Sequence, residues 1–244
     1  DSVTIMRGCF GGCSYCSITT HQGRIVQSRS HASIVGEVEG MGKNDAFKGI
    51  VSDIGGPTAN MYRMRCTRPE VEAVCRRLSC VYPKVCKLLG TDHGPLKKIM
   101  REARSKPGVR KVFVASGVRM DLARKDPEYV RELAKHHVGG HLKVAQEHAS
   151  PKALKLMKRH GPEEFVEFGE LFKRESKAAG KDQYLVPYFI SSHPGSDLEA
   201  MIELAIFLKR QGYKPAGDGS GTCGAAGFYD LNGGTSDCRY CYTI

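Results

Sequence analysis

Short apolar runs along this chain alternate with longer stretches in which apolar residues recur every three or four positions. A short apolar run bounded by turn residues is typical of a buried strand, whereas the three-to-four spacing is typical of an amphipathic helix. The pattern predicts strands at residues 3–6, 48–54, 110–116, 139–145 and 183–190. Predicted helices lie between them, and this repeated strand–helix alternation is typical of a parallel sheet in an α/β protein.

Polar side chains and prolines mark where several of these helices begin. Asp or Ser before Pro combines a capping side chain with a residue suited to the first helical position. We expect helices from 94 to about 106, from 126 to about 137, at 163–179 and up to about 209. The predicted capping residues are Ser30, Asp126, Ser150 and either Ser196 or Asp197.

Three cysteines, Cys9, Cys13 and Cys16, lie within eight residues directly after the first predicted strand. Glycines at 8, 11 and 12 allow a tight loop that turns the thiols inward, because glycine adopts positive φ without steric cost. Short runs of thiolates hold iron–sulfur clusters, and three ligands on a four-iron cluster leave one iron open for chemistry. The alternatives are weaker, because structural zinc takes four ligands and disulfide frameworks suit small secreted domains.

The C-x3-C-x2-C spacing, with aromatic Tyr15 just before the last cysteine, resembles the signature of the radical S-adenosylmethionine (SAM) superfamily. The chain is most similar to YgiQ-type radical SAM proteins, over about residues 2–215. The matching stretches are residues 4–13, 52–62, 79–83, 136–140 and 184–190.

This resemblance implies an enzyme with a partial (β/α)6 barrel, a TIM-like fold, that holds a [4Fe–4S] cluster and SAM. An electron from the cluster would cleave SAM reductively, and the 5′-deoxyadenosyl radical would abstract hydrogen from a substrate that the sequence does not identify. The electron donor would be a protein such as flavodoxin or ferredoxin. The family pattern also implies a sixth strand after residue 213, but residues 214–244 contain no convincing strand.

Glycines at the end of the second predicted strand are candidate SAM contacts, because ligands bind α/β sheets at the carboxyl ends of the strands. The resemblance implies that Gly55 and Gly56 touch the methionine amino group. Pro57 stands where the superfamily often has an acidic residue, so that contact would come from backbone or from Asp53. Tyr15 is a further cofactor-binding candidate. The alternative for the glycines is a plain strand–turn.

Polar residues after the later strands are also candidates. Ser116 and Arg119 would meet the carboxylate or ribose of SAM, because arginine binds a carboxylate through two N–H groups. A surface salt bridge is an equal alternative for Arg119. Glu147 or His148 would handle protons or contact the cofactor, with a structural hydrogen bond as the alternative. His193 would deliver a catalytic or cofactor-contacting group, or else cap its loop.

A second group of cysteines lies in a polar insertion at residues 58–92, after the second predicted strand. Four cysteines, flanked by basic residues that lower a thiol's pKa, suit a second iron–sulfur cluster or a structural zinc. The alternative is four free thiols in a reducing compartment. The cysteines are Cys66, Cys75, Cys80 and Cys86.

The remaining organisation follows from composition. Residues 1–215 form one predicted domain, and residues 216–244 a glycine-rich tail of unknown role. In that tail Cys223, Cys238 and Cys241 suit either another metal site or a segment without fixed structure.

The 244 residues carry a net charge of +11, which permits RNA or other anionic partners. The charge is spread over segments such as 152–159, which suit solvated helix faces. No apolar run approaches the roughly 18 residues of a membrane span, and the clustered cysteines favour the cytoplasm. The alternative functions are an RNA- or protein-modifying radical SAM enzyme with an auxiliary cluster, a non-catalytic iron–sulfur electron-transfer protein, and a basic RNA-binding module.

Overall fold

The computed structural model describes residues 1–213 of the chain. The tail predicted for residues 216–244, with the metal site considered for Cys223, Cys238 and Cys241, lies outside the described residues. The position expected for a sixth barrel strand, after Tyr213, also lies outside them. Among the helices of residues 1–213, none has the length and apolar character needed to cross a membrane.

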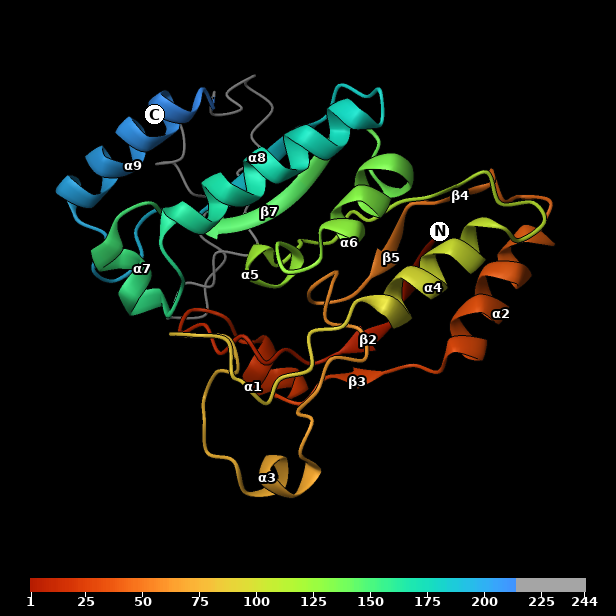
Figure 1. The fold of residues 1–244 in the computed structure, drawn as a ribbon, viewed down its shortest axis with the longest axis horizontal. Helices are drawn as coiled ribbons and strands as arrows, with labels where there is room; N and C mark the ends of the chain where they lie inside the picture. Colours follow the sequence, from red (N-terminus) through yellow and green to blue (C-terminus); the bar gives the residue numbers. More distant parts are fainter. Residues whose placement is uncertain (214–244) are drawn as a thin grey trace.

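The strands of residues 1–213 are short and pair two by two, and all but one of these pairs are parallel (Figure 1). They are β1 (Ser2–Thr4), β2 (Met6–Arg7), β3 (Gln27–Ser28), β4 (Ile50–Val51), β5 (Asp53–Gly55), β6 (Lys111–Val112), β7 (His141–Glu147) and β8 (Tyr184–Phe189). The parallel pairs are β1 with β5, β4 with β6 and β7 with β8. A bridge between Val118 and Val144 connects the β6 segment to β7, while β2 and β3 form an antiparallel pair.

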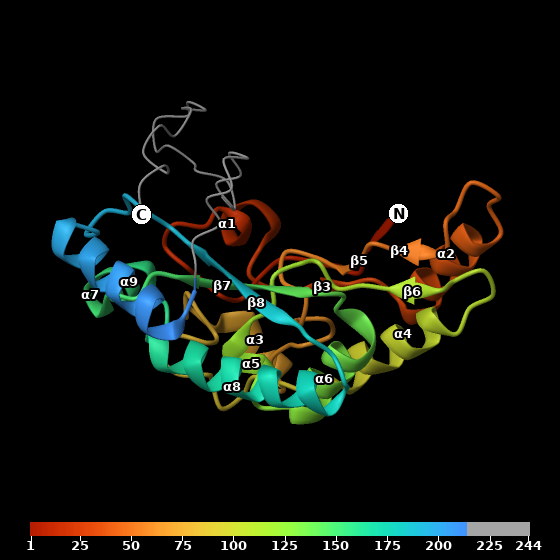
Figure 2. The ribbon, with the colours of Figure 1, turned by 90° about the horizontal axis from the view of Figure 1, so that it is seen from above.

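Helices cover one side of these strands, as Figure 2 shows for α4, α6 and α8, whereas α2 and α9 lie towards opposite ends of the row. The helices are α1 (Ile18–Gln22), α2 (His31–Gly42), α3 (Pro69–Val74), α4 (Gly94–Arg104), α5 (Met120–Ala123), α6 (Pro127–Glu132), α7 (Pro151–Met157), α8 (Pro162–Ala178) and α9 (Leu198–Gln211), with a π-helical turn at Leu133–His137. The strand–helix alternation predicted from the hydrophobic pattern is therefore present.

Three of the predicted caps are confirmed. The side chain of Ser30 accepts the backbone N–H of Ser33, and those of Asp126 and Asp197 cap α6 and α9 in the same way. The capping contact predicted for Ser150 is wrong, because its side chain makes no such bond to α7. Its backbone N–H donates instead to Nδ1 of the buried His148, 2.9 Å away, so the histidine ring organises this helix start.

Three predicted strands are divided or shortened in the structure. The run at 3–6 is split between β1, which pairs with β5, and β2, which pairs with β3. The run at 48–54 becomes β4 and β5, which pair with different neighbours. The run at 110–116 keeps only Lys111–Val112 as β6. Beyond it, the Asp53 carboxylate accepts the backbone N–H groups of Ala115 and Ser116, at 2.8 and 3.1 Å. A side chain therefore takes the donors that a longer ladder would use.

The main core lies between the strands and the covering helices. Ile54 of β5 and Leu142 of β7 are fully buried, as are the aromatic residues along α8. Phe165, Phe168 and Phe172 of α8 pack into this core, since each side chain is at most 1% exposed. Burying a side chain of this size contributes about 1.5–3 kcal/mol. This rigid layer supports the loops at the strand ends.

Candidate cluster-binding and cofactor site

The loop after β2 carries Cys9, Cys13 and Cys16, and glycines set its path. Gly8 and Gly12 have φ of +86° and +64°, a region that side-chain-bearing residues rarely adopt. A Cβ at Gly8 would lie 2.6 Å from the carbonyl oxygen of Ile25, so the backbone there requires glycine. The tight, glycine-dependent loop expected from the sequence is present.

The thiols of Cys9 and Cys13 lie beside Gly11. The backbone N–H of Gly11 donates to Sγ of Cys9 at 3.3 Å. A Cβ on Gly11 would lie 3.2 Å from Sγ of Cys9 and 3.7 Å from Sγ of Cys13, so both sulfurs border one small volume. Burial raises the pKa of Cys16, and the charges of Cys13 and Cys9 raise it further. All three cysteines are free, and each thiol is close enough to influence the others.

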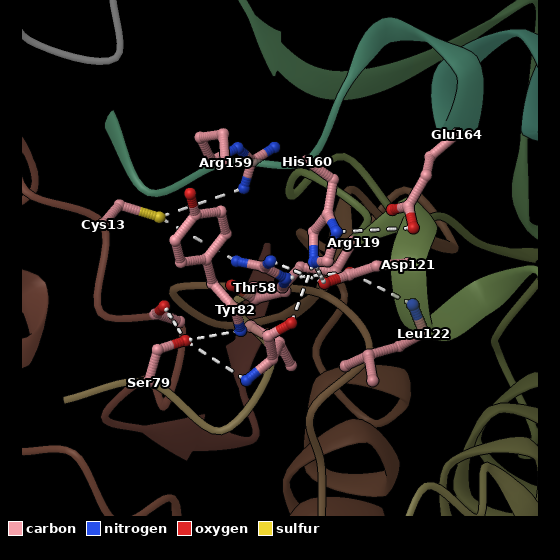
Figure 3. A network of polar contacts seen from close by, with 12 residues as sticks. Cys13, Thr58, Ser79, Tyr82, Arg119, Asp121, Leu122, Arg159, His160 and Glu164 are labelled. Carbon is pink, nitrogen blue, oxygen red and sulfur yellow. Dashed lines mark hydrogen bonds and ion pairs between the residues drawn. The ribbon is translucent and has the colours of Figure 1, made fainter. Parts of the chain in front are cut away.

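Two arginines face the middle thiol, as Figure 3 shows. Nη1 of Arg119 and Nη1 of Arg159 each lie 4.0 Å from Sγ of Cys13. Burial by itself raises the pKa of Cys13, but the positive charges of Arg159 and Arg119 outweigh it and lower that pKa. The thiolate form, which binds metal, is therefore favoured at this position.

Arg119 is held in place by a buried ion pair. Its Nε and Nη2 donate to the two carboxylate oxygens of Asp121 at 3.0 and 2.6 Å, and both side chains are less than 9% exposed. Its backbone N–H donates to Oδ1 of Asn60 at 2.8 Å. Arg119 therefore forms a salt bridge, but a buried one and not the surface one of the alternative, while its Nη1 faces the cluster loop. Contact between Arg119 and SAM stays a prediction.

Arg159 and His160 are site residues that sequence reasoning missed. They follow Lys158, which ends α7 in the left-handed conformation with φ of +56°. Arg159 also donates to the carbonyl of Ala145. Nε2 of His160 lies 3.7 Å from Asp121, the partner of Arg119 (Figure 3). Residues 152–159 look like a solvated basic helix face, so nothing in that pattern indicates that Arg159 turns towards Cys13.

Gly55, Gly56 and Ser116 line a cleft of about 270 Å³ together with residues on both flanks of the cluster loop. A Cβ on Gly55 would lie 2.5 Å from Oγ of Ser116, so packing between strands already requires this glycine. The Ser116 hydroxyl donates to the Asp53 carboxylate, which also borders the cleft. The structure therefore brings together the three strand-end residues predicted as SAM contacts, and the contacts themselves stay predictions.

Tyr15, Glu147 and His193 meet on another side of the loop. The rings of Tyr15 and His193 are edge-on, with centroids 6.2 Å apart. Glu147 has φ of +75° and is buried, and burial raises its pKa against the opposing charge of Arg159 and a hydrogen bond from Tyr15. Nδ1 of His193 donates to the carbonyl of Pro194, in keeping with its loop-capping alternative. A cofactor role for these three residues stays a prediction.

His148 has the structural role that was its alternative. The ring is fully buried, and its Nδ1 accepts the backbone N–H groups of Ala149 and Ser150. Its Nε2 lies 2.9 Å from Oγ of Ser196. The neighbouring strand-end residue Glu147 faces Tyr15, whereas His148 points into the chain and joins two loops.

The donor set of the cluster loop fits an iron–sulfur cluster better than a single metal ion. Across residues 1–213, no three His, Cys, Asp or Glu side chains converge closely enough to share one ion. A four-iron cluster does not require such convergence, because each thiolate binds a different iron. Three free thiols on one loop, with two arginines facing the sulfur of Cys13, match the ligand type and the negative charge of such a group.

The comparisons with known proteins agree with this chemistry. The model of the radical SAM superfamily matches residues 3–208. The chain is 54% identical over 214 residues to the UPF0313 protein PA4928 of Pseudomonas aeruginosa and to the UPF0313 protein YgiQ of Salmonella typhimurium, and 53% identical to YgiQ of Escherichia coli K12. These matches cover 87% of this chain but only 29–30% of each relative, so the chain spans under a third of their length.

A solved structure shows the same fold. The radical SAM methyltransferase TsrM from Kitasatospora setae, with cobalamin and a [4Fe–4S] cluster bound, matches with a TM-score of 0.53. The match covers 87% of this chain and 34% of that protein, at 12% identity, so it carries the fold alone. The resemblance found in the sequence is confirmed: this chain belongs to the radical SAM superfamily and is similar to its YgiQ-type members.

Proposed function

We propose that this chain holds a [4Fe–4S] cluster on Cys9, Cys13 and Cys16 and acts as a radical SAM enzyme. The observation that carries the proposal is the gathering of three free thiols on one glycine loop, those of Cys9 and Cys13 beside Gly11, with two arginines 4.0 Å from the sulfur of Cys13. When bound, the cluster would supply the electron for reductive cleavage of SAM into methionine and a 5′-deoxyadenosyl radical, which would abstract hydrogen from the substrate. Membership of the superfamily supports this chemistry.

The residues around the thiols adjust the charge of the site. Arg119 and Arg159 offset the negative charge of three thiolates, and the N–H of Gly11 donates to the sulfur of Cys9. Net charge and hydrogen bonds to sulfur are the main protein influences on the potential of such a cluster. The buried pair of Arg119 with Asp121 fixes one of these charges in place. These residues therefore make reduction easier than it would be in an uncharged pocket.

SAM is proposed to enter the cleft bordered by Gly55, Gly56 and Ser116. The two oxygens of Asp53 already accept three hydrogen bonds, from the N–H groups of Ala115 and Ser116 and from the Ser116 hydroxyl. The amino group of SAM would therefore bind backbone oxygens at the glycine strand end. Tyr15, Arg119, Glu147 and His193 border the other side of the cluster loop and are proposed to complete the cofactor site.

The finer features of the proposal follow the family. The parallel strands would form an open (β/α)6 barrel with residues 58–92 as its cysteine-rich insertion. A flavodoxin or ferredoxin would supply the electron, and the reducing cytoplasm would keep the thiols free. Since the relatives are more than three times as long as the match, the substrate site of the whole protein would include parts beyond this chain.

The test is release of 5′-deoxyadenosine by anaerobically reconstituted protein in the presence of SAM and dithionite. The wild-type chain is expected to release it, and Cys13→Ala to release only the background amount. Ser17→Ala is the matched control, because this exposed serine lies in the same loop and makes no side-chain capping bond. A wild-type protein that binds iron and never cleaves SAM would contradict the proposal and favour the electron-transfer alternative.

A further inference from the structure

The segment between Asn60 and His93 forms a lobe that projects from the strands and carries α3 (Figure 1). Its two ends are joined where Nδ2 of Asn60 donates to Nε2 of the buried His93 at 3.2 Å. Further out, Cys66 and Leu89 form an antiparallel bridge, and the N–H of Gly90 donates to the carbonyl of Arg65 at 2.9 Å. The lobe is therefore a closed loop with a defined backbone rather than a chain of independent turns.

All four cysteines of this lobe line a single cavity of about 270 Å³. They are separated by up to 20 positions in the sequence, so the fold, and not local spacing, brings them together. Each one is free and partly buried. The N–H of Cys86 donates to the carbonyl of Cys80 at 2.7 Å, which fixes two of them relative to each other. Apolar side chains, including Phe10 and Leu89, complete the wall.

Positive charge faces these thiols. Nη1 of Arg24 lies 3.7 Å from Sγ of Cys75, and its Nη2 donates to the Cys75 carbonyl at 2.9 Å. The side chain of Arg77 also borders the cavity. The acidic residue on the wall, Glu72, is already engaged, because its Oε1 accepts the N–H of Cys66 at 3.2 Å. A cavity with four thiols and facing arginines suits an anionic inorganic group.

We propose that Cys66, Cys75, Cys80 and Cys86 hold a second four-iron iron–sulfur cluster in this cavity. The inference goes beyond the proposed function and does not depend on SAM cleavage. Zinc bound to four thiolates needs all of them about 2.3 Å from one point. The described residues contain no three ligand side chains that converge in this way. A four-iron cluster binds each thiolate at a separate iron and spans the space between them.

The second site adjoins the back of the cluster loop. The N–H of Cys80 donates to the carbonyl of Phe10 at 3.0 Å, and the hydroxyl of Ser79 donates to the carbonyl of Gly11 at 2.6 Å (Figure 3). Phe10 and Gly11 lie between Cys9 and Cys13 in the sequence. With four protein ligands, the second cluster has no open iron, so SAM leaves its spectrum unchanged.

The test counts iron and sulfide after anaerobic reconstitution and records the electron paramagnetic resonance (EPR) spectrum of the reduced protein with and without SAM. The wild-type chain is expected to hold about eight irons. The triple variant C9A/C13A/C16A is expected to keep about four, with a spectrum that does not respond to SAM. The double variant C66A/C75A is expected to keep the other four, with a spectrum that does respond.

Arg76→Ala is the matched control in the lobe, because Arg76 is exposed and does not line the cavity, and it is expected to keep about eight irons. The triple variant leaves the lobe intact, so its iron content decides the matter even if the double variant folds poorly. A triple variant with no iron, or with about one zinc in place of iron, overturns the proposal. A triple variant that keeps its iron, beside a wild-type chain that never cleaves SAM, upholds this inference and rejects the proposed function.

Discussion

The two groups of cysteines in this chain are assembled in different ways. Cys9, Cys13 and Cys16 belong to one glycine loop, and the tightness of that loop places the sulfurs of Cys9 and Cys13 beside Gly11. The four cysteines of the α3 lobe come from separate turns and meet at one cavity only after the lobe closes. In the proposed sites, the first group would supply three ligands, which would leave an iron open for a cofactor, and the second would supply four. Ligand number therefore separates a reactive site from a closed one.

The electrostatic support also differs between the two regions. Beside Cys13, Arg119 is almost fully buried and paired with Asp121. Beside Cys75, Arg24 is only partly buried and bonds to carbonyl groups. A charge in a water-poor environment acts more strongly on its neighbours than one near solvent. The cluster loop should therefore be the region in which a single charge matters most.

The largest expected difference between the regions is in SAM cleavage. Cys16→Ala removes one of three ligands and is expected to reduce 5′-deoxyadenosine to background. Cys80→Ala leaves the cluster loop and its backbone contact with Phe10 in place, and is expected to keep cleavage. Product release is measured by chromatography after anaerobic incubation with dithionite. Equal loss in both variants would show that the two sites do not work separately.

The next largest effect is a difference in stability between breaking a buried ion pair and breaking an exposed one. Asp121→Asn leaves the Arg119 guanidinium buried without its charge partner, which is expected to lower the free energy of unfolding by about 3–5 kcal/mol. In the lobe, Glu70→Gln breaks the exposed pair of Glu70 with Arg68 and is expected to lower the free energy of unfolding far less, because solvent screens this pair. Urea unfolding of the metal-free protein measures both. A similar decrease in the free energy of unfolding in both variants would mean that Arg119 is less buried in solution than in the structure.

A smaller effect concerns the contact between the two regions. A Cβ on Gly12 would lie 2.2 Å from the carbonyl oxygen of Leu78 in the lobe, whereas a Cβ on Gly23 meets nothing within 4 Å. Both glycines have positive φ, so both alanine variants carry the same kind of backbone strain. Gly12→Ala is therefore expected to destabilise the protein by about 1–3 kcal/mol more than Gly23→Ala, the range for overpacking. Equal melting temperatures would show that the lobe shifts away at no cost.

The smallest expected effect is a pH dependence at the base of the lobe. Burial lowers the pKa of His93 to about 4, below its usual value of 6.5. Below pH 6.5 the unfolded chain therefore binds more protons at this residue than the folded one, and stability falls as the pH falls. We expect a loss of about 1 kcal/mol between pH 6.5 and 5.5, located by hydrogen exchange in the lobe rather than in the cluster loop.

Two histidine variants sharpen this pH test. His93→Gln removes the titrating ring and should flatten the dependence between pH 6.5 and 5.5. His21→Gln changes an exposed histidine on α1, in the first region, and should keep the wild-type slope. A slope that persists in His93→Gln would assign the titration to another group.

Features that depend on neighbouring residues in the sequence were predictable. The cluster loop follows from three cysteines and three glycines, and the caps at Asp126 and Asp197 follow from side chains that bond within one turn. The capping bond predicted for the Ser150 side chain was wrong, because the backbone N–H of Ser150 donates to the ring of His148 instead. Likewise, β6 is shortened by Asp53, a residue about 60 positions earlier, which no local pattern could indicate.

The charges of the site were less predictable because they depend on tertiary contacts. Arg159 looks like part of a solvated helix face, yet it lies 4.0 Å from Cys13 across 146 positions of sequence. Asp121 and His160 join Arg119 through contacts of the same long-range kind. In the lobe, the four cysteines are visible in the sequence, but their spacing does not show that they meet. Only the fold places them around one cavity.

The central claim is that the cluster on Cys9, Cys13 and Cys16 has one iron open to SAM. Mössbauer spectroscopy of the ⁵⁷Fe-reconstituted C66A/C75A variant tests it most directly, because the second site then lacks two of its four proposed ligands while the cluster loop keeps all three. Adding SAM is expected to shift the signal of about one quarter of the iron, the single iron without a thiolate. A spectrum that is the same with and without SAM would contradict the claim.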